Sequence, residues 1–430
     1  MNHTTLPATF FSANRARLAE QLLPKSLLAV NNKDVLPTNA DGTFPLHPNA
    51  DLFYLSGIEQ EESMLLLFPD AHEEKNREIL FLRDSSELLE TWEGKKLNAA
   101  EAREISGVKR VEPLSALAPL FHALMCEADN VYLDANEHPR ASTVLQDTRQ
   151  ARFVRRCMQQ YPLHRYHRLA RILYRLRCVK SEDEVAAIRR ACELTRDGLR
   201  RVCRFVRPGL NERQVEAEYA HEFISRGGKF AYSPIVASGE HACALHYVRN
   251  DAVLQDGDLL LMDVGAALGN YNSDMTRTIP INGRFTPRQR QVYDAVLRAY
   301  RACFEELKPG LLAKQWKSFA QEAVQKELVD LGLLTLDDIK SQGPDKEKLA
   351  KYFMHGVGHS IGLDVHDVQL VDTPMQAGWV VTCEPAIYIR DERIGIRLED
   401  TVVLTDQGPR SLMADIPMEA EQIEALMNQR

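Results

Sequence analysis

The chain has 430 residues, which is too many for one ordinary hydrophobic core, so two domains are expected. Hydrophobic residues make up 44% and charged residues 27%, which is the composition of a globular protein and excludes a disordered or fibrous chain. The net charge of -8 argues against a nucleic-acid partner, because phosphate binding favours basic surfaces.

The cysteines and the N-terminal segment point to the cytoplasm. The eight cysteines are scattered and none forms a Cys-x-x-Cys pair, which predicts reduced thiols. The first residues lack the apolar core of a secretory signal, and nowhere does a run of about 18 apolar residues occur. We therefore expect a cytoplasmic protein with no membrane partner.

Residues 1–176 alternate apolar strands with helical segments, which predicts a smaller N-terminal α/β domain. One helix is expected at residues 16–23. The expected strands are short apolar runs at 26–30, 63–68, 78–82 and 128–134.

A basic, helix-forming segment covers residues 151–177. It fits either a nucleic-acid patch or a solvated amphipathic linker helix, and the acidic total favours the linker. Pro162 is expected to break or kink this helix.

The pattern changes at residue 177, so 177–430 is the predicted second domain. Ser181 and Glu184 form the capping box of a long helix. Asn211 caps the next helix, and Pro287 occupies the first turn of a third. A fourth helix is expected at 314–332, with strands between and after the helices.

The first predicted hairpin carries two aspartates. Asp263 lies within the apolar strand LLLMDV, where a lone carboxylate costs several kcal/mol unless it is paired or binds a metal. A turn centred on Leu268-Gly269 would place Asp274 of the return strand directly opposite. A divalent cation between the two would offset their repulsion, although an aspartate in a turn and one bonded to backbone amides would explain them separately.

A second apolar hairpin repeats the arrangement. A turn at Asp391-Glu392 sets Glu384 opposite Glu399, with Arg397 on the same face two residues earlier. Four inward carboxylates are enough to hold two metal ions roughly 3.5–4 Å apart.

The stretch MHGVGHSIGLDVHDV adds three histidines, His355, His359 and His366. It is not a His-Glu-x-x-His helix, because the glutamate is missing and glycines weaken a helix. Oxygen ligands with one imidazole suit manganese, cobalt, zinc or iron, and the remaining histidines would carry protons or donate hydrogen bonds.

These residues resemble a known family, the "pita-bread" metallopeptidases, which include methionine aminopeptidase, prolidase and aminopeptidase P. The family's five metal ligands occur in order, each within its expected phrase: Asp263, Asp274, His359, Glu384 and Glu399. The segments FPLHPNADLFYLSGIEQEESMLLLFPD and TWEGKKLNAAEA resemble the N-terminal domain of aminopeptidase P. The resemblance implies an α+β and α/β two-domain protein with a C-terminal pita-bread (creatinase/aminopeptidase) fold.

The resemblance also implies an activity. The protein would be an Xaa-Pro aminopeptidase with two divalent metal ions, manganese foremost and cobalt or zinc as alternatives. A metal-bridging hydroxide would attack the Xaa-Pro bond, with Glu384 exchanging the proton. Its partners would be peptides with an Xaa-Pro N-terminus, and it would form a homo-oligomer, either a dimer or a tetramer.

Further roles follow from matching family positions. His366 would donate to the substrate carbonyl, and His355 would orient nearby groups and the oxyanion. His246 would lie near the substrate, although it also fits a partly buried histidine between strands. Arg397 would hold Glu399 and line the proline pocket, or simply form a cross-strand salt bridge. Tyr232 would line the substrate pocket, although an aromatic before Ser-Pro is often core.

Three alternative functions stay open at this point. Prolidase shares the chemistry and acts on dipeptides. Pita-bread domains that lack ligands serve as non-catalytic binding proteins. A third alternative is hydrolysis of another carbon–nitrogen bond in a small metabolite.

Overall fold

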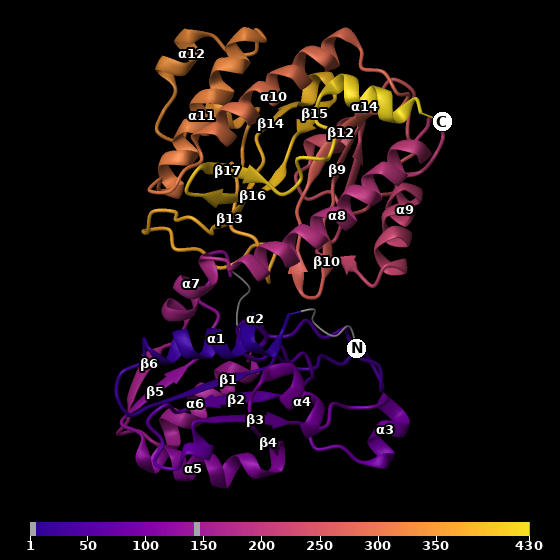
Figure 1. Ribbon diagram of the computed structural model, residues 1–430. Coiled ribbons are helices and arrows are strands. Elements are labelled where there is room, and N and C mark those ends of the chain that lie inside the picture. The colour runs from indigo at the N-terminus through magenta and orange to yellow at the C-terminus, as the bar shows by residue number, and fades with distance from the viewer. Residues whose placement is uncertain (1–5, 142–146, 430) are drawn as a thin grey trace. The chain divides into compact units, whose positions relative to one another are not determined.

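The computed structural model describes residues 6–141 and 147–429. The chain folds into two compact units, one within Thr4–Arg177 and the other within Cys178–Arg430 (Figure 1). Each unit has its own sheets, helices and core.

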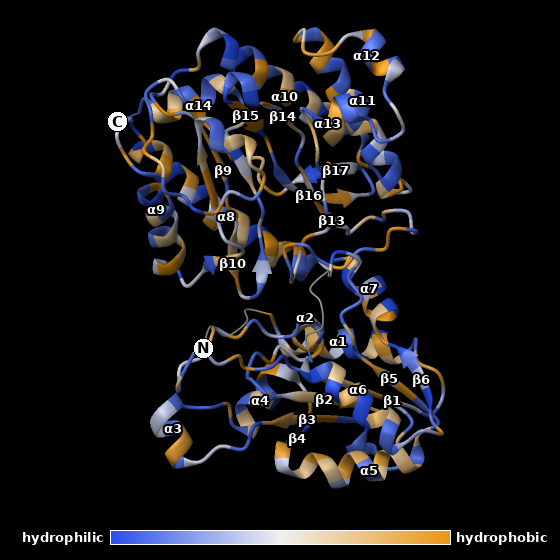
Figure 2. Ribbon diagram, turned by 180° about the vertical axis from the view of Figure 1, so that it is seen from behind, coloured by the Kyte–Doolittle hydropathy of each residue, from blue (hydrophilic) through white to orange (hydrophobic). Residues whose placement is uncertain are grey.

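The N-terminal unit is built on a six-stranded mixed sheet. The strand order is β4-β3-β2-β1-β5-β6, with β1–β2 and β2–β3 antiparallel and the other neighbours parallel. Figure 2 shows hydrophobic residues along β3, as expected for a strand covered on both faces. The strands are β1 (Ser26–Asn31), β2 (Met64–Leu67), β3 (Glu78–Leu82), β4 (Arg110–Pro113), β5 (Asn130–Leu133) and β6 (Arg165–Arg168).

Helices pack on this sheet from both sides. Phe121 of α5 and Cys157 of α6 join Leu27 and Ala29 of β1 in one buried cluster, so these two helices cover one face. The helices are α1 (Ala8–Ala19), α2 (Ala50–Ser56), α3 (Glu87–Glu93), α4 (Ala99–Ser106), α5 (Leu117–Glu127), α6 (Arg149–Gln160) and α7 (Ala170–Cys178).

Two expectations for this unit are corrected. The helix expected at 16–23 begins earlier and ends earlier, because α1 covers Ala8–Ala19 and residues 20–23 form turns. The single basic helix expected at 151–177 is two helices separated by β6, which pairs in parallel with β5. Helix α6 ends two residues before Pro162, so the predicted break is confirmed.

A buried carboxyl lies at the end of β5. Asp134 is 4% exposed and accepts a hydrogen bond from Asn49 Nδ2 at 3.0 Å. Burial, together with the nearby charge of Asp51, raises the pKa of Asp134 to about 8. The carboxyl is therefore protonated in the folded protein at neutral pH and ionised in the unfolded chain.

This raised pKa predicts a pH-dependent stability. Between about pH 4 and pH 8 the folded state holds one more proton at Asp134, so the free energy of unfolding falls as pH rises, by up to about 1.4 kcal/mol per pH unit. In Asp134→Asn this contribution is absent, so the variant gains stability relative to the wild type from pH 5 to pH 8. Urea unfolding across that range measures the difference, with the exposed Asp129→Asn as control. A difference that stays constant with pH would contradict the assignment.

The C-terminal unit combines several small antiparallel sheets with helices on their outer side (Figure 1). The sheet orders are β12-β9-β8, β11-β10-β7, β13-β16-β17 and β14-β15. The strands are β7 (Lys229–Phe230), β8 (Ile235–Ser238), β9 (Leu259–Asp263), β10 (Ala266–Leu268), β11 (Tyr271–Asn272), β12 (Thr276–Pro280), β13 (Val380–Cys383), β14 (Ala386–Ile389), β15 (Ile394–Arg397), β16 (Asp400–Thr405) and β17 (Gly408–Ser411).

The four predicted helices of this unit are confirmed. Ser181 and Glu184 form the expected capping box, Asn211 caps α9, and Thr286 caps the third helix with Pro287 in its first turn. The helices are α8 (Glu182–Phe205), α9 (Glu212–Ser225), α10 (Pro287–Glu306), α11 (Ala313–Asp330), α12 (Leu336–Ser341), α13 (Glu347–Ala350) and α14 (Ala420–Met427).

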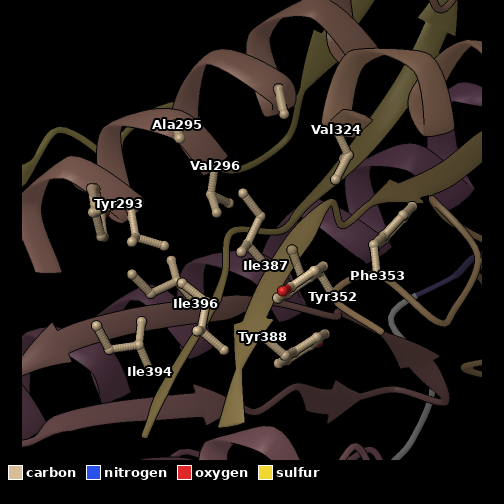
Figure 3. Close-up of a cluster of buried hydrophobic side chains, with 14 of the residues drawn as sticks. Tyr293, Ala295, Val296, Val324, Tyr352, Phe353, Ile387, Tyr388, Ile394 and Ile396 are labelled. Atoms are coloured by element: carbon tan, nitrogen blue, oxygen red, sulfur yellow. The ribbon is translucent and has the colours of Figure 1, made fainter. Parts of the chain in front are cut away.

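A large hydrophobic core supports the strands that carry the acidic residues. Val296 of α10 and Val324 of α11 pack in one cluster with Ile387 of β14 and Ile396 of β15 (Figure 3). The two helices therefore anchor the second predicted hairpin from behind. Within residues 6–141 and 147–429, no helix combines the length and the apolar composition of a membrane span.

Candidate metal centre

The two predicted hairpins lie side by side in the C-terminal unit, joined between β12 and the residues that follow β15. Asp263, the last residue of β9, is directly opposite Thr276 of β12. Thr276 in turn forms an isolated antiparallel bridge with Glu399, whose amide donates to the Thr276 carbonyl at 3.1 Å. Since directly paired residues point to the same face, these three side chains share one face.

The predicted register of the first hairpin is wrong by two residues. Asp263 faces Thr276 rather than Asp274, because the turn centres on Gly269 and Asn270 and joins Leu268 to Tyr271. Both turn residues have positive φ, 58° and 66°, as a type I′ turn requires, and asparagine tolerates this conformation. Asp274 still lies on the same face, because it precedes Thr276 by two residues.

The predicted register of the second hairpin is confirmed. The pairs Ala386–Arg397 and Cys383–Asp400 flank Glu384 and Glu399, which places the two glutamates opposite each other. Arg397 lies on the same face and makes a short ion pair with Asp263 of the other hairpin. Arg397 thus connects the two hairpins.

His359 reaches the carboxylates from a loop held against β13. Its amide donates to Thr382 Oγ1 at 3.0 Å, and its carbonyl accepts from the Thr382 amide at 2.8 Å. The preceding Gly358 is needed for this approach, because a Cβ there would lie 2.1 Å from the Thr382 carbonyl oxygen. The glycines around the histidines therefore allow the loop to pack tightly on the strand.

Three of the predicted ligands form a compact buried group. Ligand atoms of Asp274, His359 and Glu399 all lie within 4.8 Å of one another. His359 Nε2 is 3.4 Å from Asp274 Oδ2 and 3.8 Å from Glu384 Oε1. Asp263 is drawn into the same group because the Tyr232 hydroxyl lies 2.5 Å from both Asp263 Oδ1 and Asp274 Oδ1, so its single proton is shared between the two aspartates.

The electrostatics of this group are those of crowded acids. Burial raises the pKa of Glu399 well above its usual range, and the charges of Asp274 and Glu384 raise it further. Burial likewise raises the pKa of Glu384 to about 7, while His359 and Arg397 oppose the rise. One arginine cannot neutralise four carboxylates, so a bound cation would relieve their repulsion.

The hydrogen bonding of the His359 ring shows which of its nitrogens could bind a cation. His359 Nδ1 lies 3.0 Å from the Ser360 carbonyl oxygen, so this nitrogen must carry the hydrogen. In the neutral ring the lone pair of Nε2 then faces the carboxylate oxygens of Asp274 and Glu384, which is unfavourable unless a proton or a metal ion lies between them. Burial lowers the pKa of His359, yet the hydrogen bond to Asp274 and the charge of Glu384 raise it overall. The set of oxygen ligands with one imidazole therefore fits a divalent metal.

A chain of hydrogen bonds joins Arg397 to His355. Arg397 Nη1 donates to the Tyr388 hydroxyl at 2.8 Å, and that hydroxyl lies 3.0 Å from His355 Nε2. His355 Nδ1 donates to the Gly356 carbonyl at 2.7 Å, so Nε2 accepts from Tyr388. Burial, with the charge of Arg397, lowers the pKa of His355 to about 3. The ring is thus neutral, and its 3.6 Å approach to Glu384 is not an ion pair.

The other two predicted histidines lie at the exposed edge of this group. The rings of His366 and His359 meet edge to face, with their centroids 4.3 Å apart. His246 is exposed in the segment after β8 and lies near His355. Both residues are therefore in contact with solvent.

Two contributing residues were missed in the sequence. Thr276 accepts from Arg397 Nε at 2.9 Å and donates to Glu399 Oε2 at 2.6 Å, so it fixes both side chains. Tyr388 joins Arg397 to His355. Strand alternation could have found Tyr388, because it lies four residues after Glu384 and so on the same face.

Comparisons with known proteins agree with this arrangement. Residues 186–406 match metallopeptidase family M24, and residues 11–132 match the N-terminal domain of aminopeptidase P. The Xaa-Pro aminopeptidase of Haemophilus influenzae is 32% identical over 438 residues, covering 98% of this chain and 98% of the relative. That of Escherichia coli K12 is 32% identical over 436 residues, covering 97% of each chain.

A solved structure shows the same architecture. The structure of E. coli aminopeptidase P with the inhibitor Pro-Leu superimposes with a TM-score of 0.87 at 31% identity, covering 98% of both chains. The expected two-domain fold, with a C-terminal pita-bread domain and a smaller N-terminal domain, is confirmed.

Proposed function

The chain belongs to metallopeptidase family M24, and from that premise we propose that it is a metal-dependent Xaa-Pro aminopeptidase. It removes the first residue from peptides that have proline in the second position. One structural observation carries the proposal: acidic side chains from two hairpins and one imidazole converge on a single face, in the chemical pattern of a hydrolytic metal centre.

The metal centre would use the five residues predicted from the sequence. Asp263, Asp274, His359, Glu384 and Glu399 would hold two divalent ions, and the absence of sulfur from the set suits manganese, with cobalt or zinc as alternatives. When bound, such ions acidify a water molecule and polarise the scissile carbonyl.

The protein's own groups then handle protons and orient the peptide. Glu384 takes a proton from the attacking water and delivers it to the proline nitrogen as that nitrogen leaves. Neutral His355 accepts a hydrogen bond from Tyr388, and its Nδ1 lies 3.6 Å from Glu384 Oε2. His366 donates to the substrate carbonyl, and His246 lies beside the bound peptide.

Arg397 and Tyr232 complete the site by fixing the carboxylates. Arg397 holds Asp263 through an ion pair and Glu399 through Thr276. The aliphatic part of the Arg397 side chain would line the proline pocket. Tyr232 bonds to both aspartates, so it positions ligands in addition to bordering the substrate.

The family resemblance supports three further parts of the proposal. The metal in the cell is manganese, the protein acts in the cytoplasm, and it assembles as a homodimer or homotetramer. Sedimentation of the purified chain and metal analysis of the protein from its own cells test these statements.

Peptide length provides the direct test of the activity. Cleavage of Xaa-Pro-Yaa tripeptides and longer peptides should proceed with a clearly higher kcat/KM than cleavage of Xaa-Pro dipeptides, with free Xaa as the product. Cleavage restricted to dipeptides would instead identify an Xaa-Pro dipeptidase.

Removing one donor should separate catalysis from metal binding. His366→Ala is expected to lower kcat by roughly 100-fold, because a hydrogen bond made to the developing charge is lost. Metal content should stay unchanged, since His366 is not among the proposed ligands. The matched control is His221→Ala, an exposed histidine on α9. Loss of metal in His366→Ala would contradict this role.

A further inference from the structure

A separate cavity lies in the N-terminal unit, between α5 and α6 at the end of β1. Its volume is about 400 Å³, which is within the range of sites for small molecules. We propose that this cavity binds a small organic anion, one that carries a carboxylate or phosphate group on an apolar body. This site does not depend on the proposed peptidase activity.

The floor of the cavity holds a buried donor without a partner. Asn31 ends β1 and, by strand alternation, shares a face with Leu27 and Ala29, which pack against α5 and α6. Its side chain is 2% exposed and lines the cavity, yet Nδ2 has no hydrogen-bond partner among the described residues. A buried, unpaired donor costs about 1–3 kcal/mol, so an acceptor bound in the cavity would relieve it.

One face of α6 adds positive charge to the same cavity. Arg149, Arg152 and Arg156 recur at helical spacing, and all three line it. Arg152 is paired with Asp34 by a short ion pair, whereas Arg156 contacts the Gln160 side chain at 3.4 Å and no carboxylate within the described residues. The planar guanidinium groups match a carboxylate or phosphate.

Arg149 is held by hydrogen bonds to Asp34 and Glu62. Its guanidinium donates to the Glu62 carbonyl at 3.1 Å, and its amide donates to Asp34 Oδ2 at 2.8 Å. Burial lowers the pKa of Arg149, and the charge of the Glu62 carboxylate opposes this shift. Asp34 therefore balances part of the arginine charge, and the charge of Arg156 is left for a ligand.

The remaining wall is mostly apolar and aromatic, with Ser115 and Gln160 as its polar members. Leu117 and Phe121 of α5 face Phe153 of α6, with the two phenyl centroids 5.4 Å apart, and Tyr161 lies beyond them. An inorganic ion would leave this surface in contact with water. An anion with an aromatic or branched body would bury it and still reach the donors.

Calorimetric titration of the full-length, metal-loaded protein tests the proposal. The probes are 3-phenylpropionate, phenyl phosphate, the neutral amide 3-phenylpropionamide and inorganic phosphate. At least one of the two aromatic anions should bind at least about tenfold more tightly than the amide and than inorganic phosphate. The stronger of the two identifies the head group. Equal binding of the amide, or no binding of either anion at millimolar concentration, would overturn the proposal.

Two neighbouring arginines provide the matched variants. Arg156→Gln should weaken the aromatic anion by about tenfold, because it removes the guanidinium that lines the cavity. Arg155→Gln should leave affinity unchanged, because Arg155 pairs with Asp147 and does not line the cavity. Both side chains are exposed, so neither variant should fail to fold. Binding at the metal centre would be the same in both variants, and equal affinities would therefore contradict the site.

Discussion

Glu384→Gln is expected to lower kcat/KM by roughly 100- to 10,000-fold, because the amide can no longer exchange a proton with water and the leaving nitrogen. The side chain keeps its size. Residue 384 also keeps its place between β13 and β14, because its backbone N–H donates to the Val357 carbonyl at 2.8 Å. The change also removes one of four crowded carboxylates. Without metal, the free energy of unfolding of the variant should therefore be at least as high as that of the wild type.

Three measurements separate these effects: steady-state hydrolysis of an Xaa-Pro tripeptide, metal content and urea unfolding. The control is Asp391→Asn, at an 85% exposed side chain in the turn of the same hairpin, which should behave like the wild type. Turnover near the wild-type value in Glu384→Gln would refute the assignment of the proton-transfer residue.

Metal removal should have the second large effect, on stability as well as activity. Without a cation the carboxylates repel one another in a buried setting, and binding only to the folded state stabilises it by about 4 kcal/mol when free metal is 1,000-fold above Kd. Chelated protein should therefore be inactive and unfold at a lower temperature, and manganese should restore both.

The order of stability of Glu399→Gln and the wild type should differ between the metal-free and the manganese-loaded protein. Without metal the variant should be at least as stable as the wild type, since burial and the neighbouring carboxylates raise the pKa of Glu399 well above its usual range. With manganese the wild type should be the more stable of the two. Asp391→Asn should respond to manganese as the wild type does. A wild type that is insensitive to chelation and manganese would show that no metal supports this fold.

The two hairpins show how far a sequence determines a register. The second was predicted correctly because its turn at Asp391 and Glu392 separates two clear apolar runs. The first was wrong by two residues because Asn270 was not expected at positive φ, so the turn was placed one residue too early. The error preserved the face of Asp274, because the side-chain period of a strand is two.

Edge strands of the N-terminal sheet were not predicted. β4 (Arg110–Pro113) and β6 (Arg165–Arg168) each lie at one edge of the sheet and carry charged residues, so they lack an apolar run. The strands with apolar runs, such as β3 (Glu78–Leu82), were found. Polar edge strands form through pairing with a neighbour, and their own sequence does not reveal this.

The acidic residues could be selected from sequence because a carboxylate within an apolar strand is unusual, whereas only the family resemblance distinguished His359 from His355 and His366. Thr276 and Tyr388 do not stand out by residue type, since a threonine and a tyrosine are ordinary strand residues, and only the alternation from Glu384 pointed to Tyr388. Their contribution depends on which residues face them across the sheet, for example the 2.9 Å contact of Arg397 Nε with Thr276 Oγ1. Such contacts follow only from the correct register.

The most direct measurement is anomalous X-ray scattering from crystals soaked in manganese, combined with elemental analysis of the dissolved protein. We expect two anomalous peaks among Asp263, Asp274, His359, Glu384 and Glu399, and about two metal ions per chain. A site without anomalous signal after soaking in manganese, cobalt or zinc would show that these residues do not form a metal centre.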